Sequence, residues 1–216
     1  MDTRKELAIS TAKILLDIEA VRLSLREPFT WASGLKSPIY CDNRQLFGYP
    51  NRYNQVKTGL ARLIVTEYPG AEVIMGVATS GIPFAALAAE ELSIPFGYVR
   101  SESKDHGLKN QIEGACVAGK KVVVVEDLIS TAGSSVKVVN ALRAEGAIVL
   151  GIASIFTYGM QKGIDCLEAA EVRNVSLTNI DVLLEEAVKS KYITAGDVSR
   201  VKTFLNNPSD PGWMDV

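Results

Sequence analysis

The stretch "VVVVEDLISTAGSS", residues 122–135, carries the pattern that decides the fold. Its four consecutive valines have no polar residue between them, so both faces of the strand that they predict are buried. Such strands are typical of a parallel sheet covered by helices. Two acids, Glu126 and Asp127, follow the valines, and small hydroxyl and glycine residues come next. Because α/β proteins bind ligands at the carboxyl ends of their strands, we expect a ligand site here.

Apolar periodicity on either side of this stretch predicts an alternation of helices and strands. Helices are expected over residues 3–20, 54–68, 83–92, 135–145, 180–190 and 195–205, and strands over 72–77, 95–99, 121–125, 148–155 and 173–177. Residues 21–53 are interrupted by proline and glycine, which indicates loops and short strands outside the regular sheet. The tail, residues 206–216, is polar and rich in proline and glycine. We therefore expect it to be ordered only through contact with a neighbouring chain or segment.

Composition indicates a soluble protein of one domain with an added subdomain. The chain has 216 residues, of which 47% are hydrophobic, and a formal net charge of -2. Binding of nucleic acid or of a membrane surface needs a basic excess, so we expect small-molecule partners instead. Cys41, Cys116 and Cys166 lack the spacing of a zinc site or a disulfide framework. No stretch approaches the ~18 apolar residues of a membrane span, and we expect a cytoplasmic protein.

Two turns at strand ends have the composition of phosphate-binding sites. Residues 131–135 are small and precede a helix, so their backbone N–H groups point at one anion. Acids beside such a site must face hydroxyl groups or a divalent cation, because they would repel the phosphate itself. Thr79, Ser80 and Gly81 form the second turn. A solvated acid pair with an ordinary helix cap also explains the first turn, where the GxxxxGK and GxGxxG spacings of known phosphate-binding motifs are absent. A helix cap followed by Pro83 also explains the second.

The acid-pair stretch resembles the motif of type I phosphoribosyltransferases that binds 5-phosphoribosyl 1-pyrophosphate (PRPP). The stretches "FTWASGLKSPIYCDNR" (29–44), "GVATSGIPFAA" (76–86) and "YVRSESKDHGLKNQIEG" (98–114) resemble the orotate phosphoribosyltransferase branch. The resemblance implies an α/β type I phosphoribosyltransferase fold, with a parallel sheet flanked by helices and a small N-terminal hood. It implies one domain over residues 1–216, in which about 1–53 contribute the hood and about 54–160 the PRPP-binding core.

The reaction that the resemblance implies is transfer of ribose 5-phosphate from PRPP to orotate, which gives orotidine 5'-monophosphate and pyrophosphate in pyrimidine biosynthesis. Glu126 and Asp127 would hold the ribose hydroxyls and stabilise positive charge on the sugar. Mg2+ would bind mainly through the substrate, with the two acids as further ligands. The implied PRPP-binding residues are Thr79, Ser80, Gly81, Arg100, Lys104, His106, Glu126, Asp127, Leu128, Ile129, Ser130, Thr131, Ala132, Gly133 and Ser134.

The long segment over residues 100–114 is implied to cover the pyrophosphate of a neighbouring subunit, which makes a homodimer the expected assembly. Lys104 would neutralise charge there and His106 would add a contact, so the implied catalytic residues are Lys104, His106, Glu126 and Asp127. Closure of such a loop excludes water from a reactive sugar cation. By charge alone, a solvated surface loop is the first interpretation of such a segment, and only the resemblance favours function.

The hood is implied to lie over the base. Lys36, Tyr40, Arg44, Ser130 and Thr157 are the implied orotate-binding residues, since Tyr40 can stack on a planar ring and a basic side chain can meet a carboxylate. Thr157 stands in "IFTYG", where the better-known branch of the family has an arginine.

Two other functions remain open from the sequence. One is a phosphoribosyltransferase for another nucleobase, such as a purine or uracil, against which the hood and "KDHG" segments argue. The other is a non-enzymatic regulator that senses PRPP, against which the near-neutral charge and the retained loop argue.

Overall fold

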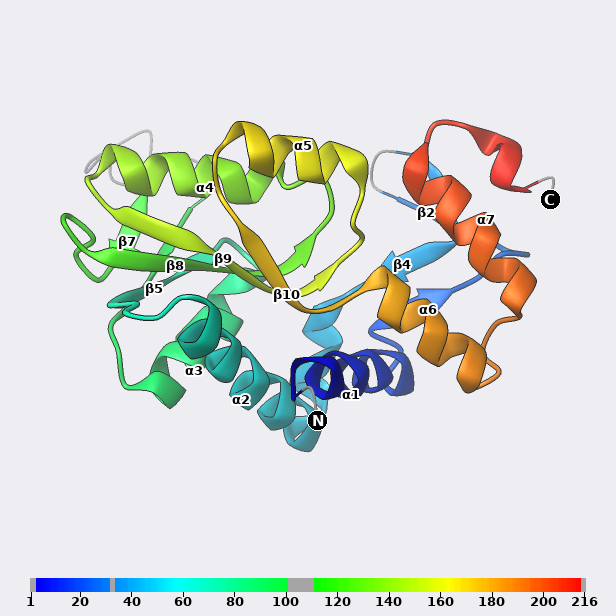
Figure 1. Cartoon of the computed structure of the whole chain (residues 1–216), viewed down its shortest axis with the longest axis horizontal. Coiled ribbons are helices and arrows are strands. Elements are labelled where there is room, and N and C mark those ends of the chain that lie inside the picture. The colour runs from blue at the N-terminus through cyan, green and yellow to red at the C-terminus, as the bar shows by residue number, and fades with distance from the viewer. Residues whose placement is uncertain (1–2, 32–33, 101–110, 215–216) are drawn as a thin grey trace.

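A six-stranded sheet forms the centre of the molecule. The computed structural model describes residues 3–31, 34–100 and 111–214. Its strand order is β10-β9-β8-β5-β6-β7, and neighbours run parallel except that β7 is antiparallel to β6 (Figure 1). The strands are β5 (Val73–Val77), β6 (Phe96–Val99), β7 (Ile112–Gly114), β8 (Lys121–Ile129), β9 (Ile148–Thr157) and β10 (Asn174–Asn179). The expected parallel sheet is confirmed, and β7 is an edge strand that the periodicity did not predict.

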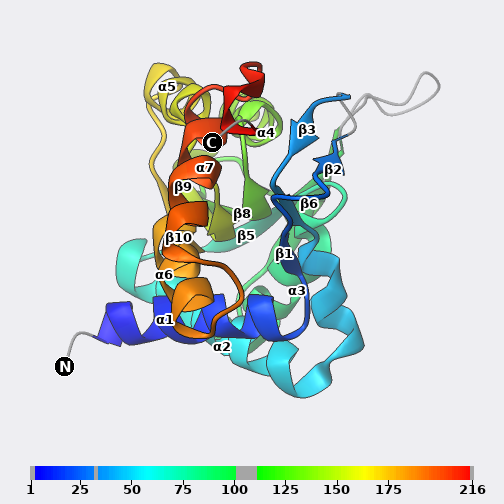
Figure 2. The ribbon, with the colours of Figure 1, turned by 90° about the vertical axis from the view of Figure 1, so that its right-hand side faces the viewer.

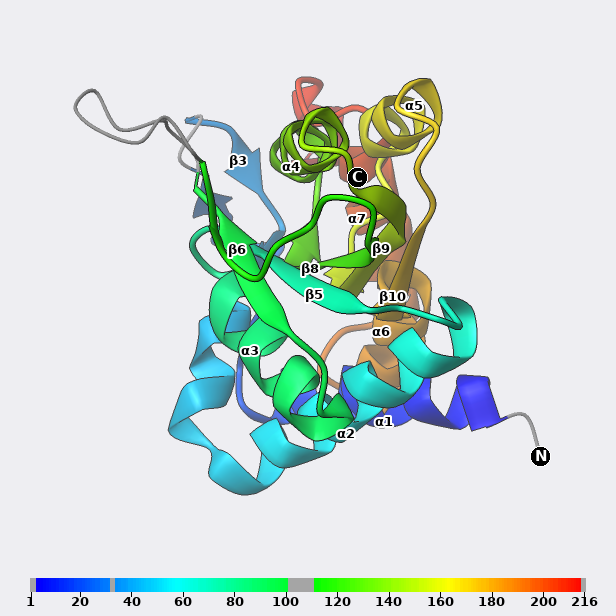
Figure 3. The same cartoon turned by 90° about the vertical axis from the view of Figure 1, so that its left-hand side faces the viewer.

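Helices cover both faces of this sheet (Figures 1 and 3). On one face lie α4 and α5, and on the other lie α1, α2 and α3. Their bounds are α1 (Thr3–Asp17), α2 (Pro50–Glu67), α3 (Gly81–Leu92), α4 (Gly133–Ala144) and α5 (Gln161–Ala169). None of the helices in the described ranges is long and apolar enough to cross a membrane.

The four valines of β8 divide between the two faces. Val122 and Val124 belong to the hydrophobic core under α4, whereas Val123 and Val125 belong to the core that contains α3. All four side chains are fully buried. The uninterrupted apolar run is therefore needed because alternate side chains of β8 enter different cores.

A second group of elements forms the hood, and its strands with α6 and α7 lie on the right of Figure 1. Short strands pair as two antiparallel ribbons, β1 with β4 and β2 with β3, and Figure 2 shows α6 and α7 beside them. The elements are β1 (Val21–Leu23), β2 (Phe29–Thr30), β3 (Lys36–Ser37), β4 (Ile39–Cys41), η1 (Asn43–Gly48), α6 (Ile180–Lys189), α7 (Ala195–Asn206) and η2 (Pro211–Met214). The hood thus combines both ends of the chain, rather than the N-terminal segment alone.

Aromatic contacts fix the C-terminal tail within its own chain. Trp213 is 1% exposed and packs edge-on against Phe204, with ring centroids 5.6 Å apart. Phe204 in turn lies 5.3 Å from Trp31, whose Nε1 donates a hydrogen bond to the carbonyl of Ile39 at 3.0 Å. The expectation that the tail needs a neighbour for its order is wrong for the part up to residue 214, because Trp213 supplies the missing apolar anchor.

Removal of this anchor should destabilise the protein strongly. Trp213→Ala is expected to lower the free energy of unfolding by about 3–5 kcal/mol, because it empties a buried aromatic site. Urea unfolding followed by circular dichroism measures the loss. Met214→Ala, at a neighbouring exposed side chain, is the matched control and should stay within about 0.5 kcal/mol of wild type. Equal effects of the two changes would contradict the packing role of Trp213.

Candidate active site

The sheet opens a crevice between β5 and β8. β5 pairs with β8 only as far as Gly76 and Val125, whereas β8 continues to Ile129 beside β9. From β5 the chain passes through α3 to β6, and from β8 it passes through α4 on the opposite face to β9. Such divergence of two neighbouring parallel strands creates a ligand crevice at their carboxyl ends.

The acid pair lies inside β8 and not beyond its end. We expected the strand to stop at Val125, but Glu126 still pairs with Ser154 of β9. On its other edge, Glu126 has no partner in β5, because β5 ends at Val77 and the chain then leads into α3. This one-sided pairing lets two acids occupy a central strand while they face a cleft.

A cleft of about 310 Å³ lies at this position. Four segments line it: the end of β4 with the start of η1, the turn after β5, the second half of β8, and the start of α4. The lining residues are Cys41, Asp42, Arg44, Ala78, Thr79, Ser80, Glu126, Asp127, Leu128 and Ser134. The structure therefore brings together seven of the residues singled out in the sequence: Arg44, Thr79, Ser80, Glu126, Asp127, Leu128 and Ser134.

Glu126 is held by hydrogen bonds in an almost dry position. Its side chain is 6% exposed, Ser135 Oγ donates to Oε2 at 3.1 Å, and the backbone N–H of Asp127 donates to Oε1 at 3.1 Å. Burial, reinforced by the adjacent Asp127 carboxyl, raises the pKa of Glu126 to about 9. Burial also raises the pKa of Asp127. Without a ligand, the pair therefore retains a proton at neutral pH, and it favours a ligand with hydroxyl groups or positive charge.

Hood residues complete the cleft from the other side. Asn43 is fully buried, and its Nδ2 donates to the backbone carbonyl of Asp127 at 2.8 Å, which fastens η1 to β8. Asp42 Oδ1 accepts from Arg44 Nε at 2.6 Å, and this hydrogen bond lowers the pKa of Asp42. The Arg44 side chain is largely exposed over the cleft. Sequence reasoning selected Arg44 but missed Asp42 and Asn43, which stand directly before it in the same "CDNR" word.

The turn after β5 brings a helix close to the acid pair. Gly81 begins α3, and a Cβ atom there would lie 2.6 Å from the carbonyl oxygen of Val125 and 3.4 Å from Glu126 Cα. A glycine is therefore required for this close approach of helix and strand. Gly81 does not itself line the cleft; it places Thr79 and Ser80 at the cleft edge, where the Ala78–Thr79 peptide bond is cis.

The turn after β8, residues 130–133, leads into α4. Ala132 caps the helix in the left-handed conformation with φ of 59°, and its side chain is buried. Ile129, before the turn, is also buried. Of the residues predicted in this stretch beyond the acid pair, Leu128 and Ser134 line the cleft. Ser130, Thr131, Ala132 and Gly133 form the turn behind it.

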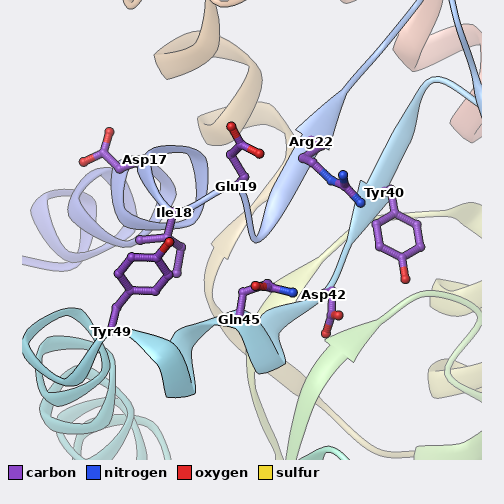
Figure 4. Close-up of a pocket in the computed structure, with 8 residues that line it drawn as sticks. All are labelled: Asp17, Ile18, Glu19, Arg22, Tyr40, Asp42, Gln45 and Tyr49. Atoms are coloured by element: carbon purple, nitrogen blue, oxygen red, sulfur yellow. The ribbon is translucent and has the colours of Figure 1, made fainter.

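The other residues predicted to bind the base lie elsewhere in the hood or at its edge. Lys36 Nζ donates to Thr30 Oγ1 at 2.8 Å on the exposed β2–β3 ribbon. Tyr40 lines a separate pocket of about 360 Å³, where the Arg22 guanidinium lies over its ring at 5.4 Å (Figure 4). Thr157 Oγ1 donates to the carbonyl of Ile129 at 3.3 Å. The structure does not bring Lys36, Tyr40 or Thr157 into the cleft lining.

The segment over residues 100–114 is described only at its two ends. Arg100 forms an ion pair with Glu113 at 3.3 Å and lines a neighbouring pocket of about 510 Å³ together with Lys137. This pocket shares Ala78 and Ser134 with the acid-pair cleft, so the two are adjacent. Lys104 and His106 lie outside the described residues.

The acid pair suits a metal ion that takes most of its ligands from a substrate. Within residues 3–31, 34–100 and 111–214, no group of three or more His, Cys, Asp or Glu side chains is arranged to hold a metal. Mg2+ binds in proteins through one or two carboxylates plus substrate phosphates and water. Glu126 and Asp127 offer that number of carboxylates in the lining of the cleft.

Comparisons with known proteins agree with this geometry. The phosphoribosyl transferase domain family matches residues 44–187. The orotate phosphoribosyltransferase of Bacillus pumilus is 52% identical over 204 residues, which cover 94% of this chain and 96% of that protein. The Bacillus subtilis orotate phosphoribosyltransferase is 50% identical over 203 residues, or 94% of each chain.

Solved structures show the same architecture. The orotate phosphoribosyltransferase of Aeropyrum pernix superposes with a TM-score of 0.69 at 34% identity, over 81% of this chain and 96% of that one. The UMP synthase of Leishmania donovani superposes with a TM-score of 0.77 at 30% identity. That match covers 92% of this chain but 42% of the synthase chain.

Proposed function

This chain belongs to the orotate phosphoribosyltransferase family, and on that basis we propose that it transfers ribose 5-phosphate from PRPP to orotate. The products are orotidine 5'-monophosphate and pyrophosphate, and the reaction is a step of pyrimidine biosynthesis. The observation that carries the proposal is the cleft in which a buried acid pair lies between two turns able to bind anions.

The positions of the cleft residues suggest which part of PRPP each of them binds. The turn over residues 130–134 binds the 5'-phosphate of PRPP through its backbone N–H groups, and Thr79 with Ser80 binds the pyrophosphate. Glu126 and Asp127 then face the ribose between the two phosphates, where they accept hydrogen bonds from its hydroxyls. As pyrophosphate leaves, positive charge develops on the sugar, and the nearby carboxylates stabilise it.

In this arrangement the hood binds the base. Arg44 is the exposed cation of the cleft and the best-placed group for the carboxylate of orotate. Its Nε is engaged with Asp42, which leaves the terminal nitrogens for a bidentate contact. Lys36 and Tyr40 are further from this role, because one is bonded within its ribbon and the other lines the pocket of Figure 4.

Three further features belong to the proposal. Mg2+ would be held by PRPP together with Glu126 and Asp127, and it would supply positive charge to neutralise the leaving pyrophosphate. The protein acts as a cytoplasmic homodimer, in which the segment over residues 100–114 reaches the neighbouring site. Lys104 and His106 of that segment contact the pyrophosphate.

The reaction is tested by the loss of orotate absorbance in the presence of PRPP and Mg2+, with adenine, hypoxanthine and uracil in parallel. Consumption of orotate alone is the expected result. Consumption of another base would indicate a different phosphoribosyltransferase. Tight PRPP binding without turnover of any base would support a PRPP-sensing regulator and overturn the enzymatic proposal.

The role of Lys104 is tested in the same assay. Lys104→Ala should lower kcat by about 10- to 100-fold, because a cation that meets the leaving group is lost. Thermal unfolding should be unchanged, since the substitution removes a charged side chain from a segment of polar sequence. Lys191→Ala, at an exposed lysine after α6, is the control. An unaltered rate for the Lys104 variant would remove this residue from the mechanism.

A further inference from the structure

Gly163, in the first turn of α5, is in direct contact with the back of the turn over residues 130–134. A Cβ atom at Gly163 would overlap the carbonyl oxygen of Ser130, and it would lie 3.4 Å from the Ser130 carbonyl carbon and 3.6 Å from Thr131 Cα. These are backbone atoms, which cannot rotate away as a flexible side chain can. The contact leaves no room for any residue other than glycine.

Helix stability gives no reason for glycine at this position. Gly163 is buried within α5, and its φ lies outside the left-handed range. Alanine at an ordinary helix position is more favourable than glycine by about 1 kcal/mol. The residue is therefore explained by the close approach to Ser130 and Thr131 and not by local conformation.

Other contacts hold the same turn from the same side. Ser130 Oγ donates to Met160 Sδ at 3.5 Å, and Met160 is the N-cap of α5. The carbonyl of Ile129 accepts from the Tyr158 N–H at 3.0 Å. The start of the turn is thus seated on the end of β9 and the first turn of α5, while its far side leads into α4 and the cleft.

We propose that Gly163 is a positioning residue for the 5'-phosphate of PRPP, a role that rests on the proposed function. It lets α5 support the Ser130–Thr131 backbone at a fixed distance, and so sets the direction of the N–H groups in the turn. Gly163 touches no substrate itself. A side chain there displaces the turn towards the cleft and weakens every ligand that carries the 5'-phosphate.

Binding of two ligands separates this role from a general loss of stability. Orotidine 5'-monophosphate carries the 5'-phosphate, whereas pyrophosphate binds at the other turn, beside Thr79 and Ser80. For Gly163→Ala, the Kd of orotidine 5'-monophosphate should rise by about 10- to 100-fold, since small misplacements at such sites cost that much. The Kd of pyrophosphate with Mg2+ should remain within about twofold of wild type, because the atoms nearest to a Cβ at Gly163 belong to Ser130 and Thr131 and not to the turn of Thr79 and Ser80.

The experiment is isothermal titration of wild type, Gly163→Ala and Gly196→Ala with both ligands, together with PRPP kinetics. Gly196 lies in α7, where an added Cβ would meet only Thr194 Oγ1 at 3.7 Å, so this control should match wild type. For Gly163→Ala, KM for PRPP should rise more than kcat falls.

The outcomes distinguish a failure of the proposed function from a failure of the role of Gly163. Wild type that neither binds PRPP nor consumes orotate would refute the proposed function, whereas active wild type with unchanged ligand affinities in Gly163→Ala would refute the role of Gly163. Equal weakening of both ligands would also refute it, as a merely structural effect. If Gly163→Ala does not fold, Met160→Leu decides: it removes the sulfur acceptor of Ser130 and should weaken orotidine 5'-monophosphate alone, and no selective weakening overturns the proposal.

Discussion

Asp127→Asn is expected to lower kcat for orotate by about 10²- to 10³-fold while the protein remains folded. The substitution keeps the shape of the side chain but removes its negative charge from the cleft where the sugar becomes cationic. The hydrogen bond from Asn43 goes to the backbone carbonyl of Asp127, so it survives the change and keeps η1 in place. The effect should therefore fall on the transition state more than on the architecture.

The orotate absorbance assay, with circular dichroism and urea unfolding, measures both parts of this expectation. Asp181→Asn is the matched control, because Asp181 is an exposed carboxylate of α6 that pairs with Lys202 at 2.7 Å, far from the cleft. It should keep wild-type kinetics. A kcat for Asp127→Asn within about threefold of wild type would show that its charge does not act in the reaction.

The central sheet was predictable because its signal is local. Four consecutive valines can be buried on both sides only in a covered strand, and the structure divides them between two cores. The turn composition after β5 and β8 likewise predicts anion sites from nearest neighbours in sequence. The end of β8 was misplaced at Val125, because two acids normally terminate a buried strand, and only the missing β5 partner shows why they do not here.

The remaining parts of the site depend on contacts between distant segments. Asn43 meets the backbone of Asp127 across 84 positions of sequence, and nothing in "CDNR" identifies that partner. Tyr40 and Cys41 are adjacent, yet alternation along β4 places Cys41 in the cleft and Tyr40 in the other pocket. Trp213 lies in a polar tail whose composition conceals its anchor. Gly163 carries no motif, and its importance appears only once α5 rests on Ser130.

Glu126→Gln should stabilise the ligand-free protein and impair its activity. Since burial raises the folded-state pKa of Glu126 to about 9, the folded protein keeps a proton that the unfolded chain releases near its ordinary value of 4.5. Between these pH values the unfolded state binds fewer protons, so wild-type stability falls as pH rises, by up to about 1.4 kcal/mol per pH unit. Below this window the group adds no such cost, and above it the cost is complete.

Glutamine is neutral throughout this range, so its advantage over glutamate should grow with pH. Its amide can keep both contacts, since its oxygen accepts from the Asp127 N–H and its NH2 group donates to Ser135 Oγ, which accepts as readily as it donates. Urea unfolding of both proteins at about pH 5.5, 7 and 8.5 should show a gap that widens upward. A pH-independent gap would contradict the raised pKa. A widening gap together with a reduced kcat would mean that the buried Glu126 carboxyl lowers the stability of the free enzyme and is nevertheless required for the reaction.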